Sequence, residues 1–110
     1  MKEIKAFVRP SMLDSVIDAL AARPEILGIT VTNVKGYGHG EGGTPAEALD
    51  YNKMEIVVSQ DHVELVTGIL MENARTGVVG DGKIFISDVE QAIRIRTGER
   101  GEIAVHQRPS

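Results

Sequence analysis

Residues 54–70 read MEIVVSQDHVELVTGIL, and this stretch joins a strand pattern directly to a helix pattern. Met54 to Ser59 is rich in branched apolar residues, which predicts a strand. Asp61 is the predicted helix N-cap, with Glu64 in the reciprocal position of a capping box. Apolar residues then recur at helical spacing and predict one buried helix face. These residues are Val63, Val66, Ile69, Leu70 and Ala74.

The first third of the chain repeats this order of strand and helix. Ile4 to Val8 predicts a strand that ends at Arg9-Pro10, and Ser11 is the predicted N-cap of the helix that follows. Arg23-Pro24 ends that helix, and Ile29 to Val34 predicts a second, half-buried strand. The apolar face of the first helix comprises Leu13, Val16, Ile17 and Leu20.

The remaining segments complete an α+β plan. Gly36 to Gly43 is too rich in glycine for a regular element, and residues 45–50 predict a single helical turn. Lys83 to Ser87 predicts a fourth strand, and Ile93 to Arg96 alternates, which predicts a short extra C-terminal strand with both arginines on one face. The order βαββαβ is that of a ferredoxin-like subunit with two helices on a four-stranded antiparallel sheet. Its uncovered sheet face predicts a symmetric oligomer.

Composition limits the classes of function. A chain of 110 residues is one small domain, and a net charge of −4 argues against nucleic-acid binding. The absence of cysteine excludes disulfides and thiolate metal sites, and the three histidines do not have metal-ligand spacing, so we predict no metal centre. No apolar run suits a signal peptide or a membrane span. We therefore expect a cytoplasmic protein without direct membrane insertion.

Two segments carry the chemistry of phosphate binding. Gly77 to Lys83 reads GVVGDGK, and Arg94 to Gly101 reads RIRTGERG. Glycine lets backbone N–H groups approach a phosphate without a Cβ in the way, and lysine and arginine provide the countercharge. Together the two segments predict a cradle for a polyphosphate.

Two familiar phosphate-binding motifs are excluded. The segment Gly77 to Lys83 has P-loop spacing, but Ile84 stands where that motif needs Ser or Thr, and a strand follows in place of a helix. Gly38 to Gly43 matches G-x-G-x-x-G, but the chain returns as a strand too soon for a crossover helix. The sequence therefore predicts neither a P-loop nor a Rossmann nucleotide site.

Each segment also has a purely structural interpretation. Gly80 to Gly82 is consistent with a plain turn between helix and strand. Arg94 and Arg96 are consistent with the solvated face of an edge strand, where charge discourages aggregation. The combination of glycine-rich and cationic segments in one short chain favours the phosphate site.

These segments resemble the signatures of the PII signal-transduction proteins. Thr76 to Phe85 is similar to the family's B-loop signature, Ile93 to Gly101 to its C-terminal signature, and Thr30 to Gly38 to the strand that enters its T-loop. The resemblance covers about residues 1–104 as a single domain. It implies a T-loop at about 38–52, a B-loop at about 75–83 and a C-loop at about 94–104, and residues 105–110 are expected to be a flexible tail.

The resemblance implies a homotrimer that binds adenine nucleotides, ADP, AMP or ATP, in clefts between subunits. The phosphate side is expected to use Gly80, Asp81, Gly82 and Lys83 from one wall and Arg94 and Arg96 from the other. The base and ribose side is expected to use Thr30, Gly36, Gly38 and Val57, and Tyr37 and Phe85 complete the predicted site. The resemblance implies a regulator and not an enzyme, which contacts an unidentified target protein, a transporter or metabolic enzyme, through its T-loop.

The segment between Gly38 and Glu55 departs from the standard PII pattern. It is shorter, and Tyr51 lies at its far end, outside the family's modifiable setting, so we do not expect uridylylation. His39-Gly40 replaces an Arg-Gln pair that in the family serves the terminal phosphate, magnesium and 2-oxoglutarate, and glycine has no side-chain oxygen for a hard cation. Tyr51 also falls near the place of the family's oxoglutarate-binding lysine. We therefore predict poor or absent binding of 2-oxoglutarate with Mg-ATP, and use of ADP or AMP beside ATP.

The glycine-rich segment is also a candidate site for a second, small anion. His39, Gly40, Gly42 and Gly43 would offer backbone N–H groups and one imidazole. PII-like proteins with short T-loops include some linked to inorganic carbon, near carboxysomes or bicarbonate transporters, which makes bicarbonate the candidate ligand. The same glycines are equally consistent with a plain hinge.

The sequence thus predicts a regulator that senses adenylates and responds by ordering its T-loop unequally with and without nucleotide. One alternative is a nitrogen-regulatory PII that acts on an ammonium transporter or a nitrogen-metabolism enzyme. A second is a small enzyme on the same fold that processes phosphate esters, for which Asp81, Glu55 and His39 are the available acid–base groups. A third is an assembly module that binds no ligand.

Overall fold

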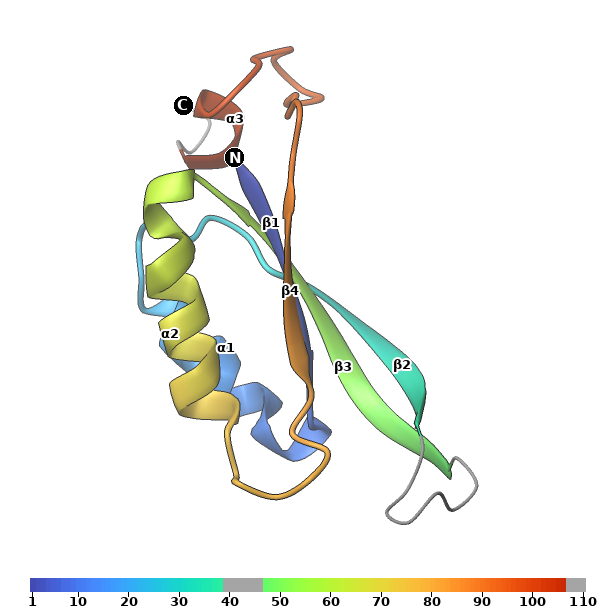
Figure 1. Cartoon of the computed structure of the whole chain (residues 1–110). Helices are drawn as coiled ribbons and strands as arrows, with labels where there is room; N and C mark the ends of the chain where they lie inside the picture. Colours follow the sequence, from blue (N-terminus) through green and yellow to red (C-terminus); the bar gives the residue numbers. More distant parts are fainter. Residues whose placement is uncertain (39–46, 107–110) are drawn as a thin grey trace.

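The chain folds into a four-stranded antiparallel sheet with two helices on one face (Figure 1). A computed structural model gives this fold and describes residues 1–38 and 47–106. The elements are β1 (Lys2–Val8), η1 (Pro10–Met12), α1 (Leu13–Ala21), β2 (Thr30–Gly38), β3 (Glu47–Val58), η3 (Gln60–His62), α2 (Val63–Ala74), β4 (Lys83–Asp88) and α3 (Ile103–His106). The predicted ferredoxin-like plan is confirmed.

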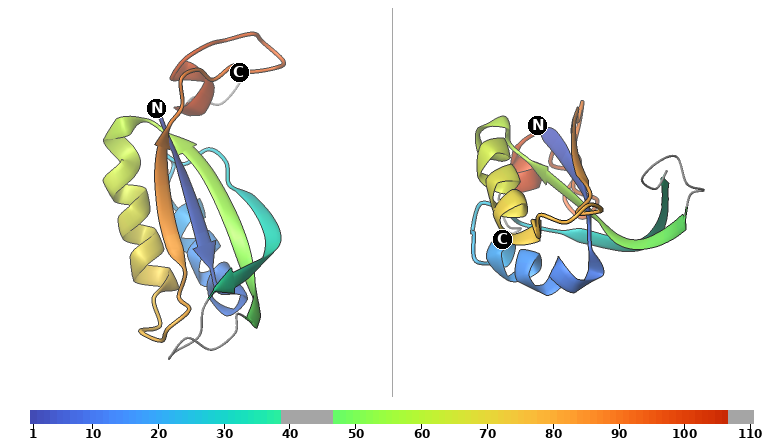
Figure 2. Two further views of the ribbon diagram at one scale, coloured as in Figure 1. Left: turned by 45° about the vertical axis from the view of Figure 1, so that its right-hand side comes forward. Right: turned by 60° about the horizontal axis from the view of Figure 1, so that its bottom comes forward.

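The sheet has the strand order β2-β3-β1-β4, and its register separates a buried face from an open one. Ile4 pairs with Ile56 on one side and with Ile86 on the other, so these residues share a face. That face packs against Val16 and Leu20 of α1 and against the apolar residues of α2. Each fully buried aliphatic side chain stabilises the fold by about 1.5–3 kcal/mol before the cost in chain entropy. Among the described residues, no helix covers the opposite face (Figure 2).

Both helices begin differently from the prediction. Pro10 opens a 3₁₀ turn, and α1 starts only at Leu13, so Ser11 lies inside that turn and is not the N-cap. Before α2 the capping oxygen comes from Ser59, which accepts a hydrogen bond from the backbone N–H of Asp61 at 3.4 Å. Ser59 is the last extended residue before the turn, and only that position directs a side-chain oxygen at the first free amides. No described helix has the length and apolar character that a membrane span needs.

Strands β2 and β3 form a longer hairpin than the sequence predicts. Residues 36–38 belong to β2, and β3 begins at Glu47, so the helical turn predicted for 45–50 is wrong in its described part. Cross-strand pairs such as Lys35–Asp50, with 2.9 Å between Nζ and Oδ1, fit the extended pairing. The hairpin curves away beyond the helices (Figure 2). Of the predicted T-loop, the end from 47 to 52 is therefore strand, and 39–46 lies outside the described residues.

The C-terminal segment is a bridged turn and not a strand. Ile93 and Arg100 form an isolated β-bridge, the N–H of Arg94 donates to the carbonyl of Glu99 at 2.9 Å, and the N–H of Gly98 donates to the carbonyl of Arg94 at 2.8 Å. The predicted extra C-terminal strand is thus wrong for the single chain, because Thr97-Gly98 reverses it after only one bridge. Residues 105 and 106, predicted as tail, close α3, and residues 107–110 lie outside the described chain.

Candidate functional site

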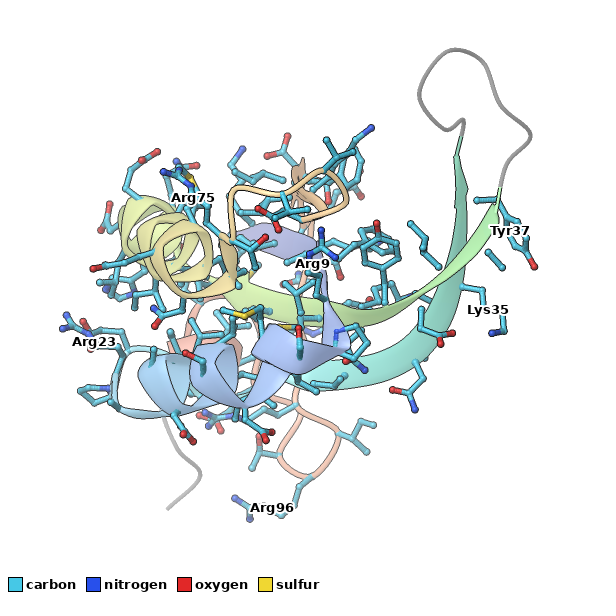
Figure 3. The ribbon with its side chains drawn as sticks, turned by 90° about the horizontal axis from the view of Figure 1, so that it is seen from below. Arg9, Arg23, Lys35, Tyr37, Arg75 and Arg96 are labelled. Atoms are coloured by element: carbon cyan, nitrogen blue, oxygen red, sulfur yellow. The ribbon has the colours of Figure 1, made fainter. Side chains whose placement is uncertain are left out.

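The two segments predicted to hold phosphate lie at opposite ends of the subunit. The B-loop precedes Lys83 at one end of β4, and the C-loop follows the other end (Figure 1). The six residues of β4 span roughly 17–20 Å. One chain therefore does not bring Lys83 together with Arg94 and Arg96. In the view from below, Arg9 lies by the B-loop, whereas Arg96 projects from the C-loop behind (Figure 3).

The carboxylate of Asp81 organises the B-loop. It accepts hydrogen bonds from the backbone N–H groups of Thr76 and Gly77, both at 2.9 Å, and from the hydroxyl of Thr76. These donors, Thr76 first, hold the pKa of Asp81 well below its usual value. The side chain of Asp81 thus closes the loop internally. Only its backbone is available for the phosphate contact that the sequence predicts.

Arg9 holds the other side of the same loop, a role that the sequence did not predict. Its Nε lies 3.0 Å from Oδ1 of Asp81, and its terminal nitrogen donates to the carbonyls of Val79 at 2.6 Å and Val78 at 3.3 Å. In the sequence, Arg9-Pro10 was interpreted only as the end of a strand. A cation placed immediately after a core strand was the available signal, but its target is 72 positions away in the sequence.

Gly82 allows the loop to approach β1 at a distance that excludes any side chain. A Cβ on Gly82 would lie 1.7 Å from the carbonyl oxygen of Phe7, and the residue has φ +100°. Within the described chain, the N–H groups of Gly80 and Gly82 have no hydrogen-bond acceptor, and the ammonium of Lys83 has no ion-pair partner. Unpaired amides beside an unpaired ammonium are what an anion site requires.

Tyr51 connects the hairpin to the B-loop. Its hydroxyl donates to the carbonyl of Gly80 at 3.1 Å. Its ring lies against Gly36, where a Cβ would stand 2.9 Å from the ring atom Cε2. From the sequence, Tyr51 was interpreted only as a departure from the family's loop, because no local pattern predicts a partner 29 residues away.

Most residues predicted for the base and ribose lie on the open sheet face. Thr30 pairs with Glu55, Glu55 with Lys5, and Lys5 with Phe85, so these four form one row across the sheet. Thr30 and Phe85 are consequently at opposite edges, three strand spacings or about 14 Å apart. Val57 lies on the same face, one row further along β3.

The hairpin glycines and Tyr37 are divided between the two faces. Gly36 lies on the open face against Tyr51, and Gly38, two residues further along β2, lies on the same face. Tyr37 lies between these two glycines in β2 and therefore on the opposite face, and it is 71% exposed. Figure 3 shows Tyr37 pointing away from the body of the subunit. The structure therefore does not bring Tyr37 to the B-loop, whereas Gly36 lies against Tyr51, which bonds to that loop.

The two C-loop arginines differ in environment. Arg94 donates to Oε1 of Glu99 at 3.1 Å, and its side chain is 13% exposed. The hydroxyl of Thr97 donates to the same oxygen at 2.9 Å, and these bonds, Thr97 first, lower the pKa of Glu99. Arg96 is exposed and has no ion-pair partner in the described part of the chain. The two arginines thus do not share a strand face as predicted: Arg94 supports the loop, and Arg96 is available.

One groove borders the B-loop on its helix side. It is lined by apolar residues of α2, Leu70, Met71 and Ala74, and by Asp81 to Lys83. The C-loop arginines, Thr30 and Val57 are not among its walls. This groove therefore contains Asp81, Gly82 and Lys83 but not the predicted residues of the C-loop or of the base and ribose side, in agreement with their division between two ends and one open face.

The predicted second-ligand residues His39, Gly40, Gly42 and Gly43 lie outside the described residues. Across residues 1–38 and 47–106, no group of three or more His, Cys, Asp or Glu side chains could hold a metal ion. The bicarbonate site accordingly stays a prediction.

Comparison with known proteins places the chain in a family. The model of the family described as "Nitrogen regulatory protein P-II" matches residues 1–99. Proteins of that name from Cereibacter sphaeroides and Nostoc punctiforme are 47% and 46% identical, and "Nitrogen regulatory protein P-II 1" from Escherichia coli is 43% identical. Each alignment covers 96% of this chain and 100% of the relative.

The same alignments bear on chain length. They have 113 positions, and 96% of 110 residues is about 106, so about seven positions have no counterpart in this chain. The T-loop is the predicted place of this difference. The extent of the match, the level of identity and the βαββαβ fold agree. The chain belongs to the nitrogen regulatory protein P-II family.

Proposed function

We propose that the protein is a regulator that binds an adenine nucleotide between neighbouring subunits and reports it to a target protein. One observation carries the proposal: each half of the predicted phosphate site is formed within the subunit, but the halves lie at opposite ends of it. The B-loop presents unpaired amides and Lys83, and the C-loop presents Arg96. A second copy has to supply the missing wall.

The positions of the two half-sites determine which type of oligomer can form the cleft. A contact between the B-loop end of one subunit and the C-loop end of the next is head-to-tail, and head-to-tail contacts that close produce a ring. The family resemblance implies three subunits. Apolar side chains at both ends support the contact, since Val79 is 85% exposed and Ile95 is fully exposed in the single chain.

The ligand class follows from the charges and the family. Unpaired B-loop amides, the ammonium of Lys83 and the guanidinium of Arg96 suit a chain of phosphates. The family resemblance implies that this phosphate chain belongs to an adenine nucleotide. We propose ADP and AMP as ligands beside ATP, because His39-Gly40 replaces the family's terminal-phosphate pair. Tyr51, hydrogen-bonded to Gly80, stands where the family uses a lysine for 2-oxoglutarate. We propose weak or absent binding of 2-oxoglutarate with Mg-ATP, because Tyr51 and Gly40 stand at or near the places of residues that the family uses for it.

The names of the relatives favour nitrogen regulation as the pathway. For this pathway we propose action on an ammonium transporter or a nitrogen-metabolism enzyme. The inorganic-carbon hypothesis depends on residues 39–43 and has no support from the described contacts. Isothermal titration of bicarbonate into the ADP-loaded protein separates the two. Absence of heat at millimolar bicarbonate removes the carbon hypothesis and leaves the nucleotide proposal intact.

The enzyme alternative has little support from the acid–base groups. Asp81 is held ionised by Thr76, Gly77 and Arg9, and a carboxylate of lowered pKa is a weak general base. Glu55 faces the ammonium of Lys53 at 3.6 Å. Asp81 is therefore not poised to accept a proton, Glu55 is engaged in an ion pair, and His39 lies outside the described residues.

The test of the proposed function is a titration of ADP into wild-type protein and into Lys83→Ala. Loss of one charge-assisted contact is expected to weaken binding roughly 10- to 150-fold, while light scattering shows an unchanged trimer. Lys35→Ala is the matched control, because Lys35 pairs with Asp50 on the hairpin, away from the B-loop. Equal affinity of wild type and Lys83→Ala would refute the site, and a monomer of wild type would refute the inter-subunit cleft.

A further inference from the structure

We propose that Tyr51 is a positioning residue that couples the conformation of the B-loop to that of the β2–β3 hairpin. The coupling deepens the proposed function, because it would give a nucleotide on the B-loop a physical connection to the segment that meets a target. The contact itself is independent of any ligand. It consists of the hydroxyl of Tyr51 on the carbonyl of Gly80 and of its ring between two glycines.

The ring of Tyr51 lies between the hairpin and the loop, and its close approach to the hairpin requires that Gly36 has no side chain. A Cβ on Gly36 would lie 2.9 and 3.0 Å from ring carbons Cε2 and Cδ2. On the other edge, a Cβ on Gly82 would lie 3.7 Å from Cε1. Tyr51 is thus in contact range of β2 and of the B-loop at the same time.

The outer part of the hairpin, which is β3 before Asn52 and the part of β2 paired with it, has few other connections to the rest of the chain. Pairing between β1 and β3 ends at Val8 opposite Asn52, so the part of β3 before Asn52 pairs only with β2. The side-chain bonds Lys35–Asp50 and Asn52–Asn33 stay inside the hairpin. Among the described residues, Tyr51 makes the side-chain hydrogen bond that leaves the hairpin for the B-loop.

Small movements of the loop are sufficient to change this contact. The distance from the Tyr51 hydroxyl to the Gly80 carbonyl is 3.1 Å, and a further shift of about 0.5 Å takes it out of hydrogen-bond range. Gly80 is also one of the residues whose amide is predicted to meet phosphate. An anion that moves Gly80 therefore changes the restraint on the hairpin. If the anion binds the state with the Tyr51–Gly80 bond and the state without it unequally, it shifts the population of hairpin conformations between these two states.

The test is a double-mutant cycle without ligand, read by amide NMR shifts of the hairpin. Asp81→Ala disturbs the B-loop by removing the acceptor of Thr76 and Gly77, and Tyr51→Phe removes only the hydroxyl. We expect Asp81→Ala to shift hairpin amides when it is made in the wild-type protein. When it is made in the Tyr51→Phe protein, about half or more of that response should be lost. Arg9→Ala disturbs the loop from its other side and serves as the second perturbation.

The matched control is Tyr37→Phe, which removes the same atom from the opposite face of the hairpin and is expected to leave the response intact. An equal hairpin response with and without the Tyr51 hydroxyl, or none in either protein, would overturn the coupling. An ADP titration of the same proteins is the separate arm for the proposed function. Failure of wild type to bind ADP would count against the nucleotide site and would leave the result of the mutant cycle for Tyr51 unchanged.

Discussion

Substitution of Gly82 by alanine tests the shape of the B-loop. Two penalties add at this position. A residue with a Cβ at φ +100° is strained by about 1–2 kcal/mol, and the Cβ would meet the Phe7 carbonyl oxygen at 1.7 Å, for which crowding costs about 1–3 kcal/mol. The sum of roughly 2–5 kcal/mol corresponds to a fall in Tm of roughly 8–20 °C for a domain of this size.

Gly77→Ala is the matched control for backbone strain. Gly77 has φ +84°, but a Cβ there meets nothing within 4 Å, so only the first penalty applies. We expect its Tm to fall by roughly 4–8 °C. The measurement is thermal unfolding followed by circular dichroism at one protein concentration, because oligomer stability depends on concentration. A Gly82→Ala protein that is no less stable than Gly77→Ala would refute the close approach of the loop to β1.

Further predictions concern charge. Because the folded pKa of Asp81 is depressed below 3.8, its stabilisation is complete above that value and is lost as the pH falls through the lower, folded pKa. The Tm difference between wild type and Asp81→Asn should stay constant from about pH 8 to 5 and shrink in acid; a difference that vanishes near neutral pH would contradict this. Arg96→Ala should weaken ADP binding with unchanged amide exchange in the C-loop, whereas Arg94→Ala should also speed that exchange, because Arg94 holds Glu99. Similar exchange in both variants would show that the arginines are equivalent.

The strands and helices could be predicted because their signals are local. The apolar-rich run at Ile4 to Val8 and the helical spacing from Val63 to Ala74 depend on neighbours within a turn or a strand pair. The helix starts were displaced because Pro10 opens its turn early and Ser59, the last extended residue, provides the cap. The hairpin was underestimated because glycine was taken as a strand breaker, although β2 is an edge strand and tolerates it at 36 and 38.

The contacts that shape the B-loop could not be predicted from local patterns. Arg9 reaches Asp81 across 72 positions, and Tyr51 reaches Gly80 across 29. The resemblance pointed to the B-loop as a functional segment. Which of its groups shape the loop and which are available to a ligand depends on the tertiary contacts with Arg9 and Tyr51. In the C-loop, alternation of Ile and Arg suggested a strand, whereas the hydrogen bonds around Glu99 form a turn that separates Arg94 from Arg96.

Complementation between two defective subunits tests the inter-subunit site most directly. Under the proposal, Lys83→Ala and Arg96→Ala would each remove one wall of every cleft, so each variant alone is expected to bind ADP weakly. When the two are unfolded, mixed in equal amounts and refolded, about one quarter of the clefts should combine an intact B-loop with an intact C-loop from different chains. We predict recovery of tight ADP binding at that stoichiometry. A mixture that binds no better than the separate variants would contradict a site shared between subunits.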